Sequence, residues 1–376
     1  MIAATPPIVK NSRGNHRYLK QLIEVLREGA FDLHLVSDEH PSYAGYLDEL
    51  QELGVQRHVA PFCSQPEQAA RALDAVLTEV SPTIVHVNGH HGWLSPSIVA
   101  SKDFDDVPHR IYTMHLPLTA LAILEAGSWK RFIPGSWSNK AVGSDRCFLR
   151  RFNRVLSVSY RYGRQLQDSG LLRDCQVTSI ANAIDTTVFQ PEEPVERDEI
   201  IIGGAGNFIP QKRFDLLIHA FGKVHQDYPR ARLVLAGEGA DEQDLVRLAD
   251  RMGIADSVTF LGFQSDMARF YNSLDMFVIS SDSEAAPFVA LEAASCGVPV
   301  VSTSVGDVPD WFHDGSSALI APCGSADALA ERMIRLVGDP ALRKQIGAAA
   351  RNLMVEKYSS EQWRLRMKEW FEQVGS

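Results

Sequence analysis

The amino-acid sequence predicts an α/β protein of two domains, each with a parallel sheet covered by helices on both faces. The length of 376 residues suits two domains of ordinary size. Short apolar runs alternate with amphipathic segments of helical period, which is typical of parallel sheets. An acidic, proline-rich segment at 189–199, FQPEEPVERDE, is expected to be the linker between the two domains.

The expected strands are short runs of mainly β-branched and other apolar residues. In the first half they are residues 32–37, 83–88, 110–115 and 154–159, and in the second half 200–204, 232–237, 258–262, 276–280, 299–303 and 318–322. Helical periodicity is clear over 215–226, 241–252 and 326–337. Ligands bind beyond the carboxyl ends of strands in open parallel sheets, so both domains are expected to line one central cleft.

The domain boundaries follow from this pattern. We expect an N-terminal domain over 1–190 and a C-terminal domain over 191–358. The remaining segment, 359–376, is expected to form a helix that packs back on the N-terminal domain.

The composition is that of an ordinary globular protein, with 45% hydrophobic and 22% charged residues. No apolar run is long enough to span a bilayer, and the N-terminus lacks a signal-peptide pattern. The cysteines are dispersed without a C-x-x-C pair, which indicates reduced thiols in a cytoplasm. The formal charge of −10 argues against nucleic acid as a general partner. We therefore predict a soluble, cytoplasmic protein.

Two glutamates stand in an otherwise apolar segment, SEAAPFVALEAASCGVPVV at 283–301. A helix is expected over about 288–296, because Gly297 is a typical helix stop. Glu284 then precedes the helix and can face the cleft, whereas Glu292 lies one turn inside it.

This arrangement suits a nucleotide sugar. Free N–H groups at the helix start, near Phe288 and Val289, are well placed for a phosphate. The two carboxylates can accept hydrogen bonds from sugar hydroxyls. The alternative is two solvated glutamates, which the apolar neighbours disfavour.

A glycine turn follows the first strand of the second half, in IIIGGAGNFIPQKRFDLLIHAF. A dinucleotide fingerprint continues Gly204 and Gly206 with a third Gly or Ala, and Ile209 stands there instead. The turn can be a phosphate clamp that uses Lys212 and Arg213. A strand–helix turn with a surface lysine explains the same pattern equally well.

Several segments together resemble one family. SEAAPFVALEAASCGVPVVST resembles the E-x7-E signature of the family-4 glycosyltransferases, which have the GT-B fold of two Rossmann-like domains. GNFIPQKRFDLLIHAF resembles their phosphate segment, and LAGEGADEQDLVRLADRMGIADSVTFLGF their nucleotide-base segment. SVGDVPDWFHDGSSALIAP, IANAIDTTVFQP, TIVHVNGHH and YTMHLP also have counterparts. The order of the whole set makes the resemblance specific.

The resemblance implies retaining transfer of a sugar from a UDP- or GDP-linked donor to an acceptor hydroxyl. The C-terminal domain would bind the nucleotide sugar and the N-terminal domain the acceptor. Bacterial polysaccharide, lipopolysaccharide or glycoconjugate biosynthesis is the implied setting, with a glycan, a lipid-linked molecule or a small molecule as acceptor. The resemblance implies no cofactor, and we expect no metal.

The resemblance also implies roles for single residues. Lys212 would pair with the donor pyrophosphate, and Glu292 would hold the ribose hydroxyls. Glu284 would contact the transferred sugar, and Phe263 would lie near the base. His115 would approach the sugar from the other domain, although a strand-end histidine bonded locally is the alternative.

Three groups of site residues are expected. The catalytic residues are Glu284, His115 and Lys212, the donor-binding residues are Asn207, Lys212, Arg213, Phe263, Pro287, Phe288, Val289 and Glu292, and the acceptor-binding residues are Gly14, Asn15, His90 and His91.

This chain departs from the family pattern in three places. Asn207 stands where the family usually has an arginine, and Arg213 is the cation that can compensate. Ala286 and Pro287 replace a phenylalanine–glycine pair, which removes a flexible position and an amide donor. The first strand and its glycine-rich loop are reduced to MIAATPPIVKNSRGNH.

Other classes of function fit less well. A nicotinamide-dependent oxidoreductase would need the complete glycine fingerprint, and a sugar-nucleotide epimerase would need an acid–base pair that the sequence does not show. A catalytically weak nucleotide-sugar-binding protein would follow if Asn207 removed turnover. The DFDD segment at 103–106 resembles a metal-binding D-x-D, but we expect a solvated loop there.

Residues 129–164 carry nine basic residues and one acid, interleaved with aromatic rings. One hypothesis is that this face docks on an anionic membrane surface or holds a phosphate-bearing acceptor. The alternative is solvated helix faces around a partly buried aromatic core.

Overall fold

The structure, a computed structural model, places the described residues in two compact units. Unit 1 comprises Met1–Asn182 and Trp363–Ser376, and unit 2 comprises Ala183–Gln362. The structure describes residues 2–5, 13–29, 31–38, 49–50, 52–62, 65–88, 91–115, 143–172, 175–193 and 197–375, with the side chains of 2–5, 13–17 and 91–93 left out.

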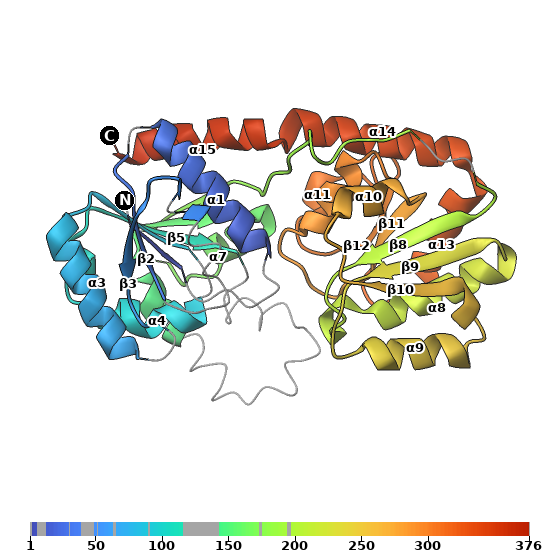
Figure 1. Ribbon diagram of the computed structural model, residues 1–376, viewed down its shortest axis with the longest axis horizontal. Coiled ribbons are helices and arrows are strands. Elements are labelled where there is room, and N and C mark those ends of the chain that lie inside the picture. The colour runs from blue at the N-terminus through green and yellow to red at the C-terminus, as the bar shows by residue number, and fades with distance from the viewer. Residues whose placement is uncertain are drawn as a thin grey trace. The chain divides into compact units, whose positions relative to one another are not determined.

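Unit 1 contains a seven-stranded parallel sheet with the order β3-β2-β1-β4-β5-β6-β7 (Figure 1). Its strands are β1 (Ile2–Thr5), β2 (His34–Ser37), β3 (Gln56–Val59), β4 (Ile84–Asn88), β5 (His109–Met114), β6 (Arg154–Ser157) and β7 (Gln176–Ser179). Its helices are α1 (Arg13–Glu28), α3 (Pro66–Val80), α4 (His91–Ala100), the 3-10 helix η2 (Phe104–Asp106), α7 (Tyr160–Asp168) and most of α15 (Ser360–Gly375).

Unit 2 contains a six-stranded parallel sheet with the order β10-β9-β8-β11-β12-β13. Its strands are β8 (Ile200–Ala205), β9 (Ala231–Ala236), β10 (Val258–Gly262), β11 (Met276–Ile279), β12 (Val300–Thr303) and β13 (Leu319–Ala321). Its helices are η4 (Pro210–Lys212), α8 (Phe214–Asp227), α9 (Glu242–Arg251), η5 (Ala255–Ser257), α10 (Met267–Asn272), α11 (Phe288–Ser295), α12 (Val308–Trp311), α13 (Ala326–Gly338) and α14 (Pro340–Lys357).

Helices cover both faces of the unit 2 sheet. On one face α8 packs against α9 and α13, and on the other α11 packs against α10 and α14 (Figure 1). The sequence sets several of the helix starts. Ser325 accepts a bond from the Ala328 N–H before α13, and Asp339 accepts one from the Leu342 N–H before α14. Such caps satisfy N–H groups that have no partner inside the helix. The predicted pair of Rossmann-like units is confirmed.

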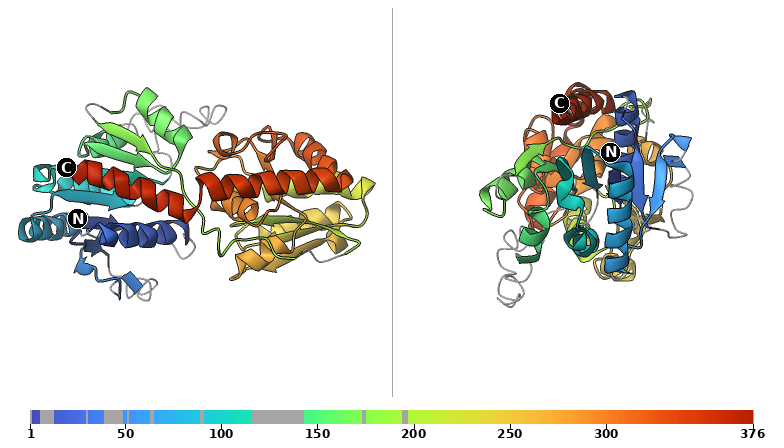
Figure 2. Two further views of the ribbon diagram at one scale, coloured as in Figure 1. Left: turned by 90° about the horizontal axis from the view of Figure 1, so that it is seen from above. Right: turned by 90° about the vertical axis from the view of Figure 1, so that its left-hand side faces the viewer.

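The C-terminal helix α15 belongs mainly to unit 1. It runs beside α1, as Figures 1 and 2 show. Trp363, Met367 and Phe371 are buried along it. The Trp363 ring meets the Tyr18 ring edge-on at 5.5 Å between centroids, and Arg364 forms ion pairs with glutamates of α1. An apolar stripe with a charged edge therefore attaches this helix to the first unit.

Two strands were not expected from the sequence, and both lie at the edges of the unit 1 sheet. β3 reads QRHV and β7 reads QVTS, without the apolar runs of the central strands. An edge strand pairs on one side only and is partly solvated, so polar residues are tolerated there. The reduced first strand expected in MIAATPPIVKNSRGNH is β1, which consists mainly of small residues and reads IAAT.

The change between units falls between Asn182 and Ala183, before the expected boundary at 190/191. The start of the expected linker is anchored in unit 2, because Phe189 is buried and its carbonyl accepts a bond of 2.8 Å from Arg351 of α14. The acidic, proline-rich segment at 189–199 is therefore attached to unit 2 at its first residue, Phe189.

The order of each sheet reverses at one point. This topological switch point lies between β1 and β4 in unit 1 and between β8 and β11 in unit 2. Connections leave adjacent strands there toward opposite faces of the sheet, and ligands bind beyond the strand ends. The residues that follow these four strands are thus the ones that the fold offers for binding.

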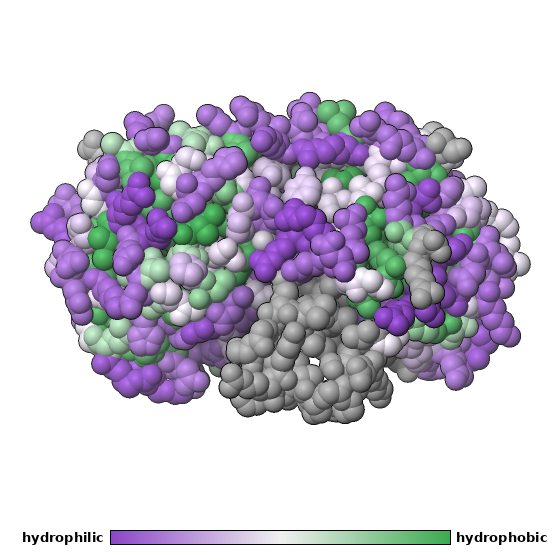
Figure 3. Space-filling model, turned by 180° about the vertical axis from the view of Figure 1, so that it is seen from behind, coloured by the Kyte–Doolittle hydropathy of each residue, from purple (hydrophilic) through white to green (hydrophobic). Residues whose placement is uncertain are grey.

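The apolar side chains lie mostly inside each unit. The unit 2 core includes Phe208, Phe221, Leu233 and Met276, all fully buried. On the face shown in Figure 3, hydrophilic residues cover most of the surface and hydrophobic ones are scattered between them. No helix in the described part of the chain combines the length and hydropathy that a bilayer crossing requires.

Candidate functional site

The strand-end loops of β8, β9 and β10 lie against one another in unit 2. The Gly206 N–H donates to the Ala236 carbonyl, and the Gly237 N–H donates to the Gly262 carbonyl. Gly237 has φ 141°, and a Cβ there would lie 1.9 Å from the Gly206 carbonyl oxygen. Only glycine permits this approach. The turn after β8 can therefore lie directly against the backbone of the loop after β9.

Lys212 and Glu284 meet at the switch point of unit 2. Lys212 ends η4 after β8, and Glu284 follows β11. The Lys212 Nζ lies 2.5 Å from Glu284 Oε1, and the two side chains are only 24% and 11% exposed. The Ser281 hydroxyl donates to the same carboxylate oxygen at 2.7 Å. Two residues that are 72 positions apart in the sequence thus form one shielded ion pair.

Helix α11 begins four residues after Glu284, as expected from the sequence. It starts at Phe288 with Pro287 at its N-cap, and the Pro287 side chain makes no cap hydrogen bond. Pro287 has no N–H of its own, so the Phe288 and Val289 N–H groups are the first donors at this end. The aligned peptide dipoles of a helix give its first turn a partial positive charge.

Glu292 is nearly inaccessible inside α11, with 6% of its surface exposed. Its Oε2 accepts a hydrogen bond of 2.8 Å from the Tyr271 hydroxyl of α10. A buried carboxylate needs such partners, because an unsatisfied one carries a large desolvation cost. No sequence pattern around Tyr271 predicts this role.

The loop that carries Glu284 is supported from β12. The Asp307 N–H donates to the Ala285 carbonyl at 2.9 Å. Gly306 has φ 49°, and a Cβ there would lie 2.2 Å from the same carbonyl oxygen. Asp307 is fully buried. The Gly-Asp pair lies in the SVGDVPDWFHDGSSALIAP segment that resembles the family, and its backbone contact with Ala285 could not be read from the sequence.

Arg213 is engaged by two carboxylates. Its Nε lies 3.0 Å from Asp215 Oδ1, and its Nη1 lies 3.0 Å from Asp282 Oδ2. These bonds raise the pKa of Arg213 above its usual value, the Asp215 bond most. Arg213 is charged in any case, and its hydrogen bonds face protein partners. The structure therefore offers no sign that it replaces the missing arginine at Asn207.

Two further expected donor contacts lie on exposed positions of the same strand-end loops. Asn207 is exposed after β8. Phe263 follows β10 and is 52% exposed. An exposed phenylalanine ring can stack on a nucleobase, but its expected role stays a prediction.

The expected residues of unit 1 fall on its own switch point. Gly14 and Asn15 lie in the first turn of α1, which follows β1, and His91 begins α4, which follows β4. The side chains of these three residues are not described, and His90 lies outside the described residues.

His115 follows β5 and is held locally. Its Nε2 lies 2.5 Å from Asn88 Oδ1 at the end of β4, and its ring meets the Tyr18 ring edge-on with centroids 4.7 Å apart. Burial lowers the pKa of His115 to about 3, so the ring is neutral at pH 7. A neutral ring that faces an amide oxygen carries its proton on Nε2.

His86, in the middle of β4, is also neutral. It is fully buried and bonds to the Thr113 hydroxyl on β5. Burial and the charge of His115 lower its pKa to about 3. The polar side chains of His86, Asn88, Thr113 and His115 thus form an uncharged cluster.

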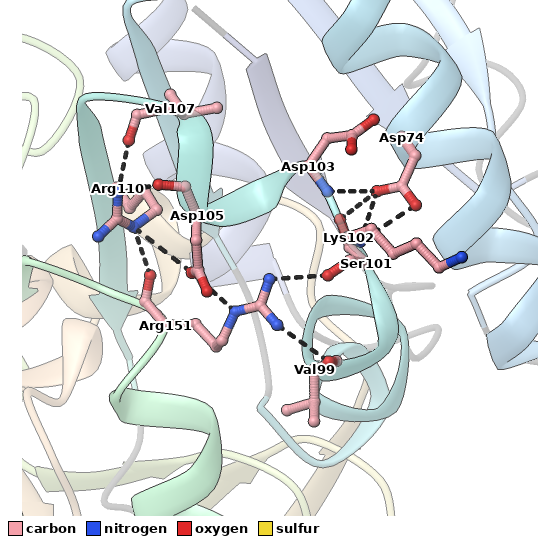
Figure 4. A network of polar contacts seen from close by, with 9 residues as sticks. All are labelled: Asp74, Val99, Ser101, Lys102, Asp103, Asp105, Val107, Arg110 and Arg151. Atoms are coloured by element: carbon pink, nitrogen blue, oxygen red, sulfur yellow. Dashed lines mark hydrogen bonds and ion pairs between the residues drawn. The ribbon is translucent and has the colours of Figure 1, made fainter.

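The DFDD segment is more structured than the expected solvated loop. It forms η2, with Phe104 in the core. Asp105 is exposed but accepts a bond of 2.9 Å from Arg151 (Figure 4). Arg151 also donates to the Val99 and Ser101 carbonyls. In the part of the chain that the structure describes, no group of His, Cys, Asp and Glu side chains has the arrangement of a metal site.

The described part of the basic segment, 143–164, gives docking on a membrane little support. Phe148, Phe152 and Tyr162 are buried, so their rings cannot reach a surface. Arg151 is engaged as above, and residues 129–142 lie outside the described residues. For the described half, the alternative of a buried aromatic core is therefore the better interpretation.

Two protein-family models match consecutive parts of the chain. The model described as "Glycosyltransferase Family 4" matches residues 12–188. The model described as "Glycosyl transferases group 1" matches residues 185–353. The chain belongs to the glycosyltransferases.

Curated relatives of this glycosyltransferase are similar over about half of their length. The chain is 30% identical over 177 residues to the N-acetyl-alpha-D-glucosaminyl L-malate synthase of Bacillus anthracis. The aligned region covers 47% of this chain and 46% of that protein. It is 33% identical over 165 residues to the lipopolysaccharide core biosynthesis glycosyltransferase LpsE of Rhizobium meliloti. That aligned region covers 44% of this chain and 47% of LpsE.

A solved structure is similar over the whole glycosyltransferase. The Anabaena protein HepE, in complex with UDP and glucose, has a TM-score of 0.76 and 18% identity over 99% of this chain and 100% of that one. At this identity the likeness shows the fold, which is GT-B as the sequence predicted.

Proposed function

We propose that this glycosyltransferase moves a sugar from a nucleoside-diphosphate sugar to an acceptor hydroxyl, with retention of the anomeric configuration. The observation that carries the proposal is the Lys212–Glu284 ion pair, with Glu284 in the loop that leads into α11. A diphosphate requires cations and N–H donors, and sugar hydroxyls require carboxylate acceptors. The switch point of unit 2 offers both kinds of group, because the loops after β8 and β11 meet there.

The proposed reaction places the charge change in unit 2. As the bond between the sugar C1 and the phosphate oxygen breaks, negative charge grows on the leaving diphosphate. Lys212 and the N–H groups of Phe288 and Val289 stabilise that charge. Glu284 orients the sugar through its hydroxyls, and Glu292 holds the ribose hydroxyls. The proposal requires no metal or cofactor, because Lys212 and the helix start supply the positive charge.

The acceptor oxygen attacks C1 on the face from which the diphosphate leaves. The acceptor proton passes to the departing phosphate oxygen, so protons and charges balance. We assign His115 the role of a neutral contact to the sugar or acceptor, in line with its low pKa.

The comparisons support a UDP-linked donor and a glycoconjugate acceptor. HepE was solved with UDP and glucose, and LpsE is described as a lipopolysaccharide core biosynthesis enzyme. The chain covers only about half of LpsE, so donor, acceptor and linkage are proposals here. A cytoplasmic location also stays a prediction, as does docking on a membrane through the exposed Arg146 and Arg150.

Thermal unfolding with a panel of UDP, GDP, dTDP and ADP tests the donor. A ligand at 100 times its Kd stabilises the native state by about 2.7 kcal/mol, so the preferred nucleotide raises Tm measurably. Proton NMR of the product from the matching α-linked sugar nucleotide then reports the configuration. Retention gives an α-linked product. A β-linked product, or a panel without any stabilising nucleotide, would contradict the proposal.

A further inference from the structure

Arg213 has an unusual backbone conformation for its residue type. Its φ and ψ are 51° and 44°, in the left-handed region. In the described part of the chain, only Ser81 shares a positive φ among residues other than glycine. A side chain in this region carries a steric cost, so surrounding contacts must hold the backbone there. The turn at Arg213 joins η4 to α8 and directly follows Lys212.

The side chain of Arg213 provides such contacts. Asp215 lies in the first turn of α8 and receives bonds from Nε and Nη2 at 3.0 and 3.1 Å. Asp282 lies in the loop after β11 and receives bonds from Nη1 at 3.0 and 3.2 Å. The planar guanidinium can bridge two carboxylates in a fixed orientation, which a lysine cannot do. Arg213 thus links the turn after β8 to the loop after β11.

Further bonds close the same two segments on each other. The Asp282 N–H donates to the Gln211 carbonyl at 3.0 Å. The Gln211 side chain donates to the Ser283 carbonyl at 2.8 Å, and the Ser280 hydroxyl donates to the Lys212 carbonyl at 2.9 Å. Lys212 therefore lies between two residues that are both bonded to the loop carrying Glu284.

We propose that Arg213 is a positioning residue for Lys212 and makes no contact with the donor phosphates. By fixing the left-handed turn and binding Asp282, it directs the Lys212 side chain toward Glu284 and the start of α11. This inference rests on the proposed function of Lys212 as the diphosphate ligand. It differs from the expectation that Arg213 compensates for the missing arginine.

The sign of the Asp282 effect separates the two roles. Asp282→Asn removes a negative charge near the expected phosphate site, which by charge alone strengthens UDP binding. If Arg213 contacts the phosphate, its release from Asp282 would strengthen UDP binding further. If Arg213 acts through Asp282, the same change instead weakens UDP binding, because the turn loses its link to the loop.

The experiment measures the Kd of UDP for Arg213→Ala, Asp282→Asn and the double variant. We expect each single variant to weaken binding on the order of tenfold, and the double variant to add little, because coupled residues are not additive. Arg213→Gly accepts the turn without strain, so it restores folding stability but not affinity. Arg332→Ala is the matched control, since Arg332 forms an exposed pair with Asp314 in the same unit.

Either of two results would overturn the inference. One is unchanged or tighter UDP binding by Asp282→Asn together with weaker binding by Arg213→Ala. The other is wild-type affinity in both variants or in Arg213→Gly. Lys212→Ala tests the underlying function separately: if it binds UDP like the wild type, the proposed function fails, whatever Arg213 does. Melting curves of every variant confirm that the fold is intact.

Discussion

An ion pair lies at the switch point of unit 2, whereas the described side chains at the ends of β4 and β5 in unit 1 are uncharged, although both sheets have their first six strands in the same order. In unit 2, Lys212 and Glu284 are an ion pair shielded from solvent. In unit 1, the residues at the ends of β4 and β5 are uncharged: Asn88 bonds to His115, and burial lowers the pKa of His115 to about 3.

The comparison indicates that the strand order decides where on the sheet a ligand can bind. The side chains at that place decide which kind of ligand binds. A charged diphosphate fits loops that present a cation and helix N–H groups. A neutral hydroxyl fits loops that present neutral polar groups, which have little attraction for an anion. The contrast matches a donor on unit 2 and an acceptor on unit 1, as proposed above.

The largest expected effect comes from removing the cation of unit 2. Lys212→Ala should lower turnover about 100- to 1,000-fold, the range found when one stabilising group is removed from a developing negative charge. Steady-state assays with the preferred donor measure it. Lys223→Ala is the control, because Lys223 forms an exposed ion pair on α8. Turnover within about twofold of wild type for Lys212→Ala would sink the assignment.

The neutral histidines of unit 1 predict acid sensitivity. Burial lowers the pKa of His86 and His115 to about 3, against 6.5 in the unfolded chain. The unfolded state therefore binds more protons below pH 6.5, so stability is complete above that pH and decreases as the pH falls toward 3. At pH 5 the loss is about 2 kcal/mol for each histidine.

Urea unfolding at pH 7 and pH 5 measures this loss. His86→Gln removes one of the two titrating groups, so its stability should fall less between these pH values than that of the wild type. Equal losses in both proteins would show that His86 is not held neutral by the fold.

A smaller effect is expected from the buried carboxylate of α11. Glu292→Ala removes an acceptor for the ribose hydroxyls and leaves the Tyr271 hydroxyl without its partner. Affinity for UDP should fall about tenfold, corresponding to about 1.4 kcal/mol. Calorimetry measures it, with Glu331→Ala on the exposed face of α13 as control. Wild-type affinity in Glu292→Ala would remove the ribose role.

The smallest effect concerns two neighbouring arginines of unit 1. Arg151 binds Asp105 and two carbonyls, whereas Arg150 is exposed. Arg151→Ala should lower the free energy of unfolding by about 1 kcal/mol, and Arg150→Ala should change it by less than about 0.5 kcal/mol. Equal values would mean that the Figure 4 network does not stabilise the unit. Vesicle-binding tests of the basic segment should therefore replace Arg150.

The central strands and α11 could be predicted because their signals are local. An apolar run such as MFVI in β11, or a glycine after a short helix, depends only on nearby residues. The glutamates of the candidate site were found for the same reason. Their apolar surroundings made two carboxylates conspicuous.

The contacts that complete the site could not be predicted, because they join distant parts of the chain. Lys212 and Glu284 meet only after β8 and β11 pair. Tyr271, Asp282 and Gly306 look like ordinary surface or turn residues in the sequence. The left-handed turn at Arg213 and its two carboxylate partners cannot be read from the letters alone either.

Calorimetric titration of UDP and uridine into the wild type and Lys212→Ala tests the central claim, that unit 2 binds the diphosphate through Lys212. The two ligands differ only in the diphosphate, so their comparison isolates its contribution. We expect Lys212→Ala to weaken UDP binding at least tenfold, a loss of about 1.4 kcal/mol of binding free energy. Uridine binding should stay unchanged. Equal affinity of both proteins for UDP, or an equal loss for UDP and uridine, would contradict it.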